Sequence, residues 1–92
     1  MNNLTLRPLQ KYDFRMVYYN DKWEILPATY EVEQIVNLMS KDGTYEKCLK
    51  NTFKWWGDSL KDKDDWDDSL MRCVRDHLAN ELNAKIKIHT DV

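Results

Sequence analysis

Carboxylates are the most concentrated side chains in this sequence that could do chemistry. Between Asp58 and Asp68 the chain has six Asp and two Lys, which gives this segment a local charge of −4. A cluster of this kind can bind calcium, but a calcium loop that began at Asp62 would need Gly at its sixth position and Glu at its twelfth. The sequence has Asp67 and Cys73 at those positions. We therefore expect no dedicated metal site in the acidic segment.

The Cys and His residues also lack the spacing of a catalytic or metal-binding site. Cys48 and Cys73 are 25 positions apart, and neither His forms a zinc-ligand pattern with them. His77 shares a predicted helix face with Cys73, where a His at the edge of the core is the simpler interpretation. The chain has two Gly, too few for a phosphate-binding loop. The sequence predicts no enzyme activity, no cofactor and no small-molecule ligand.

Both Cys fall on the apolar stripe of a predicted helix, where a free Cys behaves as a small hydrophobic residue. We expect Cys48 and Cys73 to be reduced and buried, since two Cys are too few for a disulfide-rich scaffold. The N-terminal residues lack the apolar run of a signal peptide, and no stretch approaches the ~20 apolar residues of a membrane span. These features predict a cytoplasmic protein without membrane contact.

The elements that position the acidic segment begin with a predicted β-hairpin. Residues 12–19 alternate between apolar and polar side chains, which is typical of a strand with one buried face. Asn20 and Asp21 tolerate the left-handed conformation of a tight turn, and residues 22–26 form the returning strand. Residues 4–6 fit a short additional edge strand.

Two helices are predicted to follow the hairpin. The first begins after Thr29, which can cap it, and ends near Gly43; a strand over residues 30–36 is the alternative, because that stretch is rich in β-branched side chains. The second has Thr44 as its cap and an apolar stripe about four turns long, and it ends or kinks at Gly57.

The third helix is predicted to begin after the acidic segment, with Asp64 or Asp65 as its N-cap. Residues 84–89 then alternate cleanly and predict a final strand that joins the hairpin. The facing stripes of the second and third helices should be nearly fully buried, and their members are Leu49, Phe53, Trp56, Leu70, Val74 and Leu78.

Together these elements predict an α+β fold in which a small antiparallel sheet, the N-terminal hairpin plus the C-terminal strand, packs on about three helices. The expected order is (β)ββαααβ. We expect residues 1–92 to form a single domain, because a chain of 92 residues has room for one modest core. Four Trp, five Tyr and two Phe give that core large side chains.

The acidic segment is also the strongest functional signal. Capping of the third helix explains some of its Asp residues, and a solvated capping loop is the alternative to an interface. Trp55 lies off the apolar stripe beside this segment, where an exposed Trp is typical of protein-binding sites. Clustered carboxylates can also imitate a row of phosphates and occupy a basic groove. The expected partner-binding residues are Trp55, Asp58, Asp62, Asp64, Asp65, Asp67 and Asp68.

We therefore expect a non-catalytic protein-binding module, an inhibitor that docks on a basic surface of a larger nucleic-acid-handling complex without direct nucleic-acid contact. At the level of a class, this profile is similar to phage and mobile-element host-takeover proteins, such as anti-CRISPR and anti-restriction inhibitors. One alternative is a nucleic-acid-binding accessory protein that uses residues 47–56, where Lys47, Lys50 and Lys54 accompany two Trp. The other is an immunity-like or antitoxin-like protein.

Overall fold

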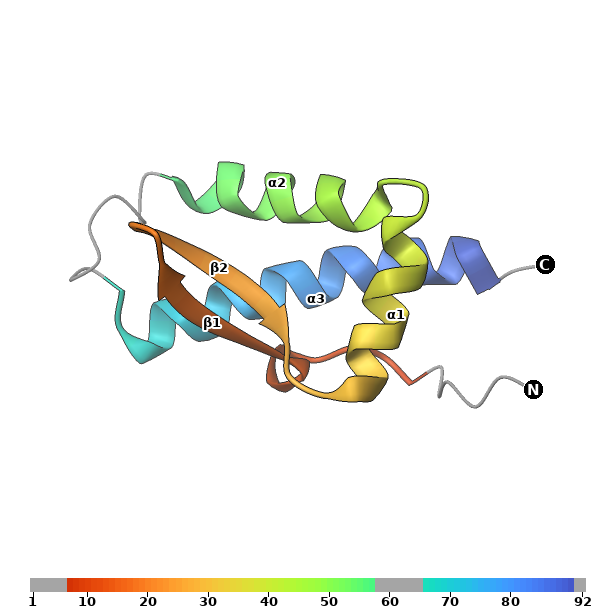
Figure 1. The fold of residues 1–92 in the computed structure, drawn as a ribbon, viewed down its shortest axis with the longest axis horizontal. Helices are drawn as coiled ribbons and strands as arrows, with labels where there is room; N and C mark the ends of the chain where they lie inside the picture. Colours follow the sequence, from red (N-terminus) through yellow and green to blue (C-terminus); the bar gives the residue numbers. More distant parts are fainter. Residues whose placement is uncertain (1–6, 58–65, 91–92) are drawn as a thin grey trace.

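A β-hairpin and three α-helices make up the part of the chain that the computed structural model describes, residues 7–57 and 66–90 (Figure 1). The elements in chain order are a short 3-10 helix η1 (Lys11–Asp13), β1 (Phe14–Tyr19), β2 (Lys22–Pro27), α1 (Tyr30–Ser40), α2 (Thr44–Trp56) and α3 (Asp68–Thr90). The fold is therefore α+β, with a two-stranded antiparallel sheet and the order ββααα. No helix in this part of the chain is long and apolar enough to cross a membrane.

The hairpin turn has the conformation that its residues predict. Asn20 and Asp21 both adopt positive φ, at 53° and 63°, and Tyr19 pairs with Lys22 across them. A two-residue turn with positive φ at both positions matches the right-handed twist of the flanking strands. The register places Phe14 of β1 on the inner face, where it is almost completely buried.

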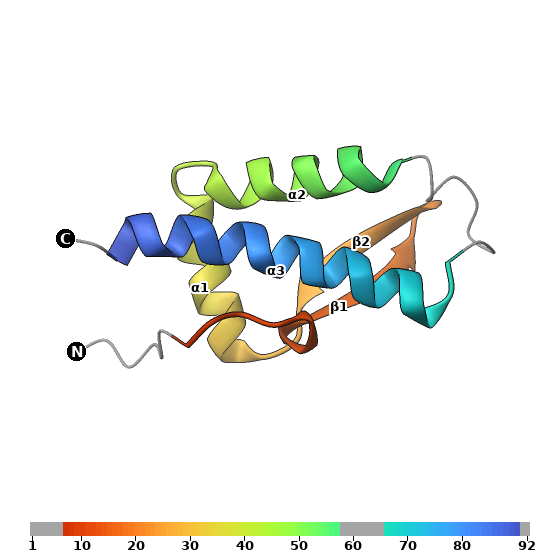
Figure 2. The ribbon, with the colours of Figure 1, turned by 180° about the vertical axis from the view of Figure 1, so that it is seen from behind.

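The hairpin lies against α3, and α2 runs beside the outer edge of β2. Figures 1 and 2 view the molecule from opposite sides, and both place β2 between β1 and α2. The hairpin covers α3 in Figure 1, and α3 covers the hairpin in Figure 2. This arrangement leaves α2 in contact with α3 along its length while one flank of α2 faces the edge of the sheet.

The core is formed where α1, α3 and the hairpin meet. The helix predicted after Thr29 is present, and its buried side chains are Val32, Ile35, Val36 and Met39. The strand alternative for residues 30–36 is therefore wrong. From α3, the residues Val74, Leu78, Ala79 and Leu82 are fully buried.

The stripes of α2 and α3 are less buried than the sequence predicts. Val74 and Leu78 are fully buried as expected, whereas Leu49, Phe53, Trp56 and Leu70 are half-buried and pack at the edge of the core. Smaller side chains of the same helix are the fully buried ones: Cys48 is 1% exposed and Thr52 is 0% exposed. Of the larger residues, Leu49 and Phe53 lie on the flank of α2 near β2, whereas Trp56 contacts His77 on α3.

The N-cap of α1 is the residue that the sequence predicts, whereas the N-cap of α2 is a different residue. Thr29 caps α1, because its Oγ1 accepts from the backbone N–H of Val32 at 3.2 Å. The N-cap of α2 is Gly43 instead of Thr44, with a φ of 81° that favours glycine. The Thr44 backbone N–H and hydroxyl donate to the carboxylate of Asp42.

The start of α3 and the end of the chain both differ from the prediction. Asp67 caps α3, since its carboxylate accepts from the backbone N–H of Leu70 at 2.8 Å; Asp64 and Asp65 lie outside the described residues. The strand predicted for residues 84–89 is wrong, because α3 continues to Thr90. A helix satisfies its backbone hydrogen bonds locally and needs no partner strand. The edge strand predicted for residues 4–6 lies outside the described part of the chain.

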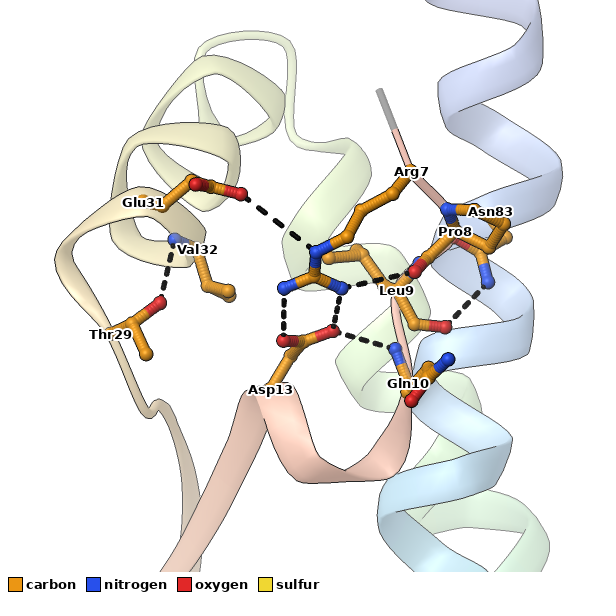
Figure 3. Close-up of polar contacts among 9 residues, drawn as sticks. All are labelled: Arg7, Pro8, Leu9, Gln10, Asp13, Thr29, Glu31, Val32 and Asn83. Carbon is orange, nitrogen blue, oxygen red and sulfur yellow. Dashed lines mark hydrogen bonds and ion pairs between the residues drawn. The ribbon is translucent and has the colours of Figure 1, made fainter. Parts of the chain in front are cut away.

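A polar clamp holds residues 7–13 against the helices (Figure 3). Asp13 is 6% exposed and accepts hydrogen bonds from the guanidinium of Arg7, at 2.6 and 2.8 Å, and from the backbone N–H of Gln10. The side chain of Asn83 on α3 bonds to both the N–H and the C=O of Leu9. These contacts satisfy the backbone of a segment that has no regular structure before η1.

Candidate protein-binding surfaces

The four tryptophans come from segments that converge on one end of the molecule. Trp23 is near the start of β2, Trp55 and Trp56 end α2, and Trp66 precedes α3. The hairpin turn, the end of α2 and the start of α3 lie together at the left of Figure 1. The rings of Trp23 and Trp66 stack with their centroids 4.7 Å apart. This end of the molecule therefore brings all four Trp residues together.

Trp55 is exposed, as the sequence predicts. Its residue exposure is 74%, although it is among the most hydrophobic side chains on the molecule. Asp67 and Asp68 are also exposed, and Asp67 uses one carboxylate oxygen to cap α3. The other predicted partner-binding residues lie outside the described part of the chain, and they are Asp58, Asp62, Asp64 and Asp65.

His77 on α3 supports the Trp55 ring from one side. The two ring centroids are 5.9 Å apart, and Trp56 donates from Nε1 to His77 Nδ1 at 3.3 Å. Because Nδ1 accepts this bond, the neutral ring carries its proton on Nε2 and donates to the Glu81 carboxylate at 2.9 Å. His77 is thus a half-buried residue at the edge of the core, as predicted, and its ring lies beside that of Trp55.

A groove that the sequence did not predict lies between β2 and α2. Its volume is about 670 Å³, and Trp23, Ile25, Leu49, Phe53 and Trp66 contribute apolar surface to it. Leu49 and Phe53 belong to the stripe that was expected to be core. The only sequence feature that pointed to a groove was the width of the apolar stripe of α2, because the contact with α3 alone cannot cover a stripe of this width.

Charged side chains surround the groove. Asp21, Glu24 and Glu46 contribute carboxylates, and Lys22 and Lys50 contribute ammonium groups. Carboxylates are therefore in the majority at this site. An apolar floor with a charged rim is typical of surfaces that bind another protein chain, because the rim sets specificity and the floor supplies buried area.

Two buried donors at this end have no hydrogen-bond partner within residues 7–57 and 66–90. They are the indole Nε1 atoms of Trp23 and Trp66, whose rings stack on each other.

The two Cys differ in their environments. Cys48 is buried as predicted, and this burial raises the pKa of its thiol. Cys73 is exposed, so the prediction of a buried residue is wrong there; the buried face of α3 is centred on its neighbour Val74 and on Leu78. Both thiols are free. Among the described residues, no group of three His, Cys, Asp or Glu side chains could hold a metal ion.

Comparison with known proteins gives no family for this chain. No protein-family model matches it, and no curated protein or solved structure shows significant similarity. A function therefore has to be inferred from the surfaces of the molecule itself.

Proposed function

We propose that this protein is a small non-catalytic binding module that acts in the cytoplasm as an inhibitor of a larger nucleic-acid-handling complex. It docks on a basic surface of that complex through Trp55 and the acidic segment that follows. The observation that carries the proposal is the 74% exposure of Trp55 at the end of α2, directly before the run of Asp residues.

An exposed Trp is suited to be a binding anchor. Tryptophan is enriched among the few interface residues that contribute most of the binding energy. The His77 ring lies beside Trp55, and we expect this contact to limit the movement of the Trp55 ring before binding, so that less side-chain freedom is lost in the complex. Asp67 and Asp68 are exposed at the start of α3 and add negative charge at the same end of the molecule.

The charge pattern supports a partner that normally binds nucleic acid. A groove that accepts phosphates is basic, and clustered carboxylates can occupy it by the same electrostatic attraction. The resemblance in size and composition to anti-CRISPR and anti-restriction inhibitors points to the same class of target. An immunity-like protein that neutralises one basic toxin would use the same surface.

The second candidate is a nucleic-acid-binding accessory protein. Lys47, Lys50 and Lys54 are all exposed on α2, and Trp55 follows them, which is the combination that single-strand binders use. Fluorescence anisotropy with labelled single- and double-stranded DNA and RNA separates the two candidates. We expect no complex at physiological ionic strength. A micromolar complex whose affinity falls steeply with salt would favour the second candidate.

Affinity capture with matched variants tests the proposed surface. The tagged protein, its Trp55→Ala variant and its Tyr30→Ala variant are each incubated with extract of the native host. Tyr30 is the matched control, because it is an aromatic residue of α1 with 76% exposure. The partner should be retained by the parent and by Tyr30→Ala and be lost with Trp55→Ala. Equal retention by all three would contradict a role for Trp55.

A further inference from the structure

The outer edge of β2 carries backbone groups that are directed toward α2. The carbonyl of Ile25 accepts a hydrogen bond from the Tyr45 hydroxyl on α2 at 3.4 Å, so this carbonyl points away from β1. In an antiparallel pair, residues that bond to the partner strand alternate with residues that face outward. Trp23 is two positions from Ile25, and its N–H and C=O therefore face the same side.

Within the described part of the chain, the backbone of Trp23 is an unpaired stretch of sheet edge. No hydrogen bond to its N–H or C=O is present among residues 7–57 and 66–90. The Tyr45 contact at Ile25 marks where α2 covers the edge. An unpaired edge of this kind is a template for another extended chain.

The groove lies directly beside this free edge. Leu49 and Phe53 of α2 line it together with Trp23, and all three side chains are half-buried. A chain that paired with Trp23 would run between β2 and α2. Its side chains would point alternately into the groove and away from it, because strand side chains alternate between the two faces.

We propose that this groove binds an extended, basic segment of the partner protein by strand addition to β2. One residue of the segment exchanges two backbone hydrogen bonds with Trp23, and a neighbouring apolar side chain enters the groove against Leu49 and Phe53. This inference deepens the proposed function and rests on it, since it names the kind of segment that the partner contributes.

Charge and shape select this occupant over a second copy of the chain. Asp21, Glu24 and Glu46 outnumber Lys22 and Lys50 at the groove, so basic residues on the segment are favoured. Two copies cannot pair through their β2 edges in the same way, because each edge lies beside its own α2 and the other hairpin brings its own helix with it (Figure 1).

Selection of peptides on the purified protein tests this inference. A displayed library of random linear peptides is the probe, and hydrogen exchange followed by NMR is the readout. Selected peptides should contain an apolar residue flanked by Lys or Arg, and they should slow exchange of the Trp23 amide. The Met16 amide is the internal control, because it faces outward on the opposite edge of the hairpin by the same alternation and should be unaffected.

Two changes separate strand addition from simple side-chain contact. N-methylation of the peptide amide that pairs with Trp23 should weaken binding at least tenfold, and N-methylation of an adjacent amide should have little effect. Glu24→Lys should weaken binding of the basic peptides about fivefold, whereas Glu33→Lys, an exposed site on α1, should not.

Three results would overturn the inference: selected peptides that leave the Trp23 amide unprotected, a library that gives no groove-binding peptide, or protection of that amide by self-association at high protein concentration. None of these results affects the outcome of the Trp55→Ala capture experiment. The inference about the groove can therefore be wrong while the proposed function is correct.

Discussion

At the scale of single residues, the polar clamp at Asp13 has the clearest energetic consequence. The hydrogen bonds from Arg7 hold the pKa of the Asp13 carboxyl below its usual range, and they outweigh the effect of burial. The same contact raises the pKa of Arg7. The charged pair also joins η1 to Glu31 of α1, whose carboxylate lies 3.9 Å from the Arg7 Nε.

The clamp predicts a pH-dependent loss of stability. A carboxyl with a lowered folded pKa stabilises the fold above its unfolded pKa of about 4, and this contribution is lost as the pH falls through the folded value. Asp13→Asn should lower the free energy of unfolding by about 1–3 kcal/mol near neutral pH. The difference from the parent, measured by urea unfolding, should shrink below pH ~4. A difference that is constant down to strongly acidic pH would contradict this role.

The thiols give a second prediction at this scale. Cys73 should react with a thiol probe in the native state, because it is exposed, and Cys48 should react only after unfolding. The Cys73→Ser variant isolates Cys48 and should stay unlabelled until denaturant is added. Rapid labelling of native Cys73→Ser would show that Cys48 is accessible.

At the scale of elements, sequence periodicity predicted the hairpin, α1 and the buried face of α2, but it overestimated the burial of Leu49, Phe53 and Trp56. The stripe of α2 contains residues of several sizes, and periodicity gives them equal weight. Packing does not, because the small Cys48 and Thr52 are fully buried whereas the larger Phe53 lines the groove. The groove could not be predicted, since it depends on where α2 stops contacting the sheet.

The C-terminal strand was predicted from a pattern that fits two structures. Ile86 and Ile88 alternate with Lys, but Leu78, Leu82 and Ile86 also follow a four-residue spacing. Continuation of α3 requires no new turn and no partner strand, and the described structure has a helix there.

The middle of α3 contributes buried side chains to the core. Replacement of such a side chain by Ala should therefore destabilise the fold more than the same replacement at the surface. Leu78→Ala should destabilise the fold by about 2–5 kcal/mol, because Leu78 is completely buried. Leu38→Ala is the matched control: Leu38 is 50% exposed on α1, and its removal should cost less than about 1 kcal/mol. The free energies of unfolding of both variants are measured by chemical denaturation. Equal losses in the two variants would contradict the placement of Leu78 in the core.

At the scale of the whole molecule, stability and proposed binding lie in different regions. The core and the clamp occupy the region where α1, η1 and the middle of α3 meet. The exposed Trp55, the groove and the described Asp residues belong to the end where α2 stops and α3 begins. Trp55 and the exposed Asp residues can therefore be changed with little effect on folding, whereas Ile25 and Trp66 of the groove are buried. Sequence reasoning found Trp55, because it lies off the stripe, but missed its partner His77 on another helix.

The central claim is that the acidic segment docks on a basic partner. The affinity of the purified partner for a variant without the charges of this segment tests that claim most directly. Replacement of Asp62, Asp64, Asp67 and Asp68 by Asn removes four charges, and folding should survive because Asn caps helices about as well as Asp. Binding to the captured partner, measured by calorimetry, should weaken at least tenfold, or about 1.4 kcal/mol. If the folded variant binds as tightly as the parent, the acidic segment is a solvated capping loop and the proposed docking surface is wrong.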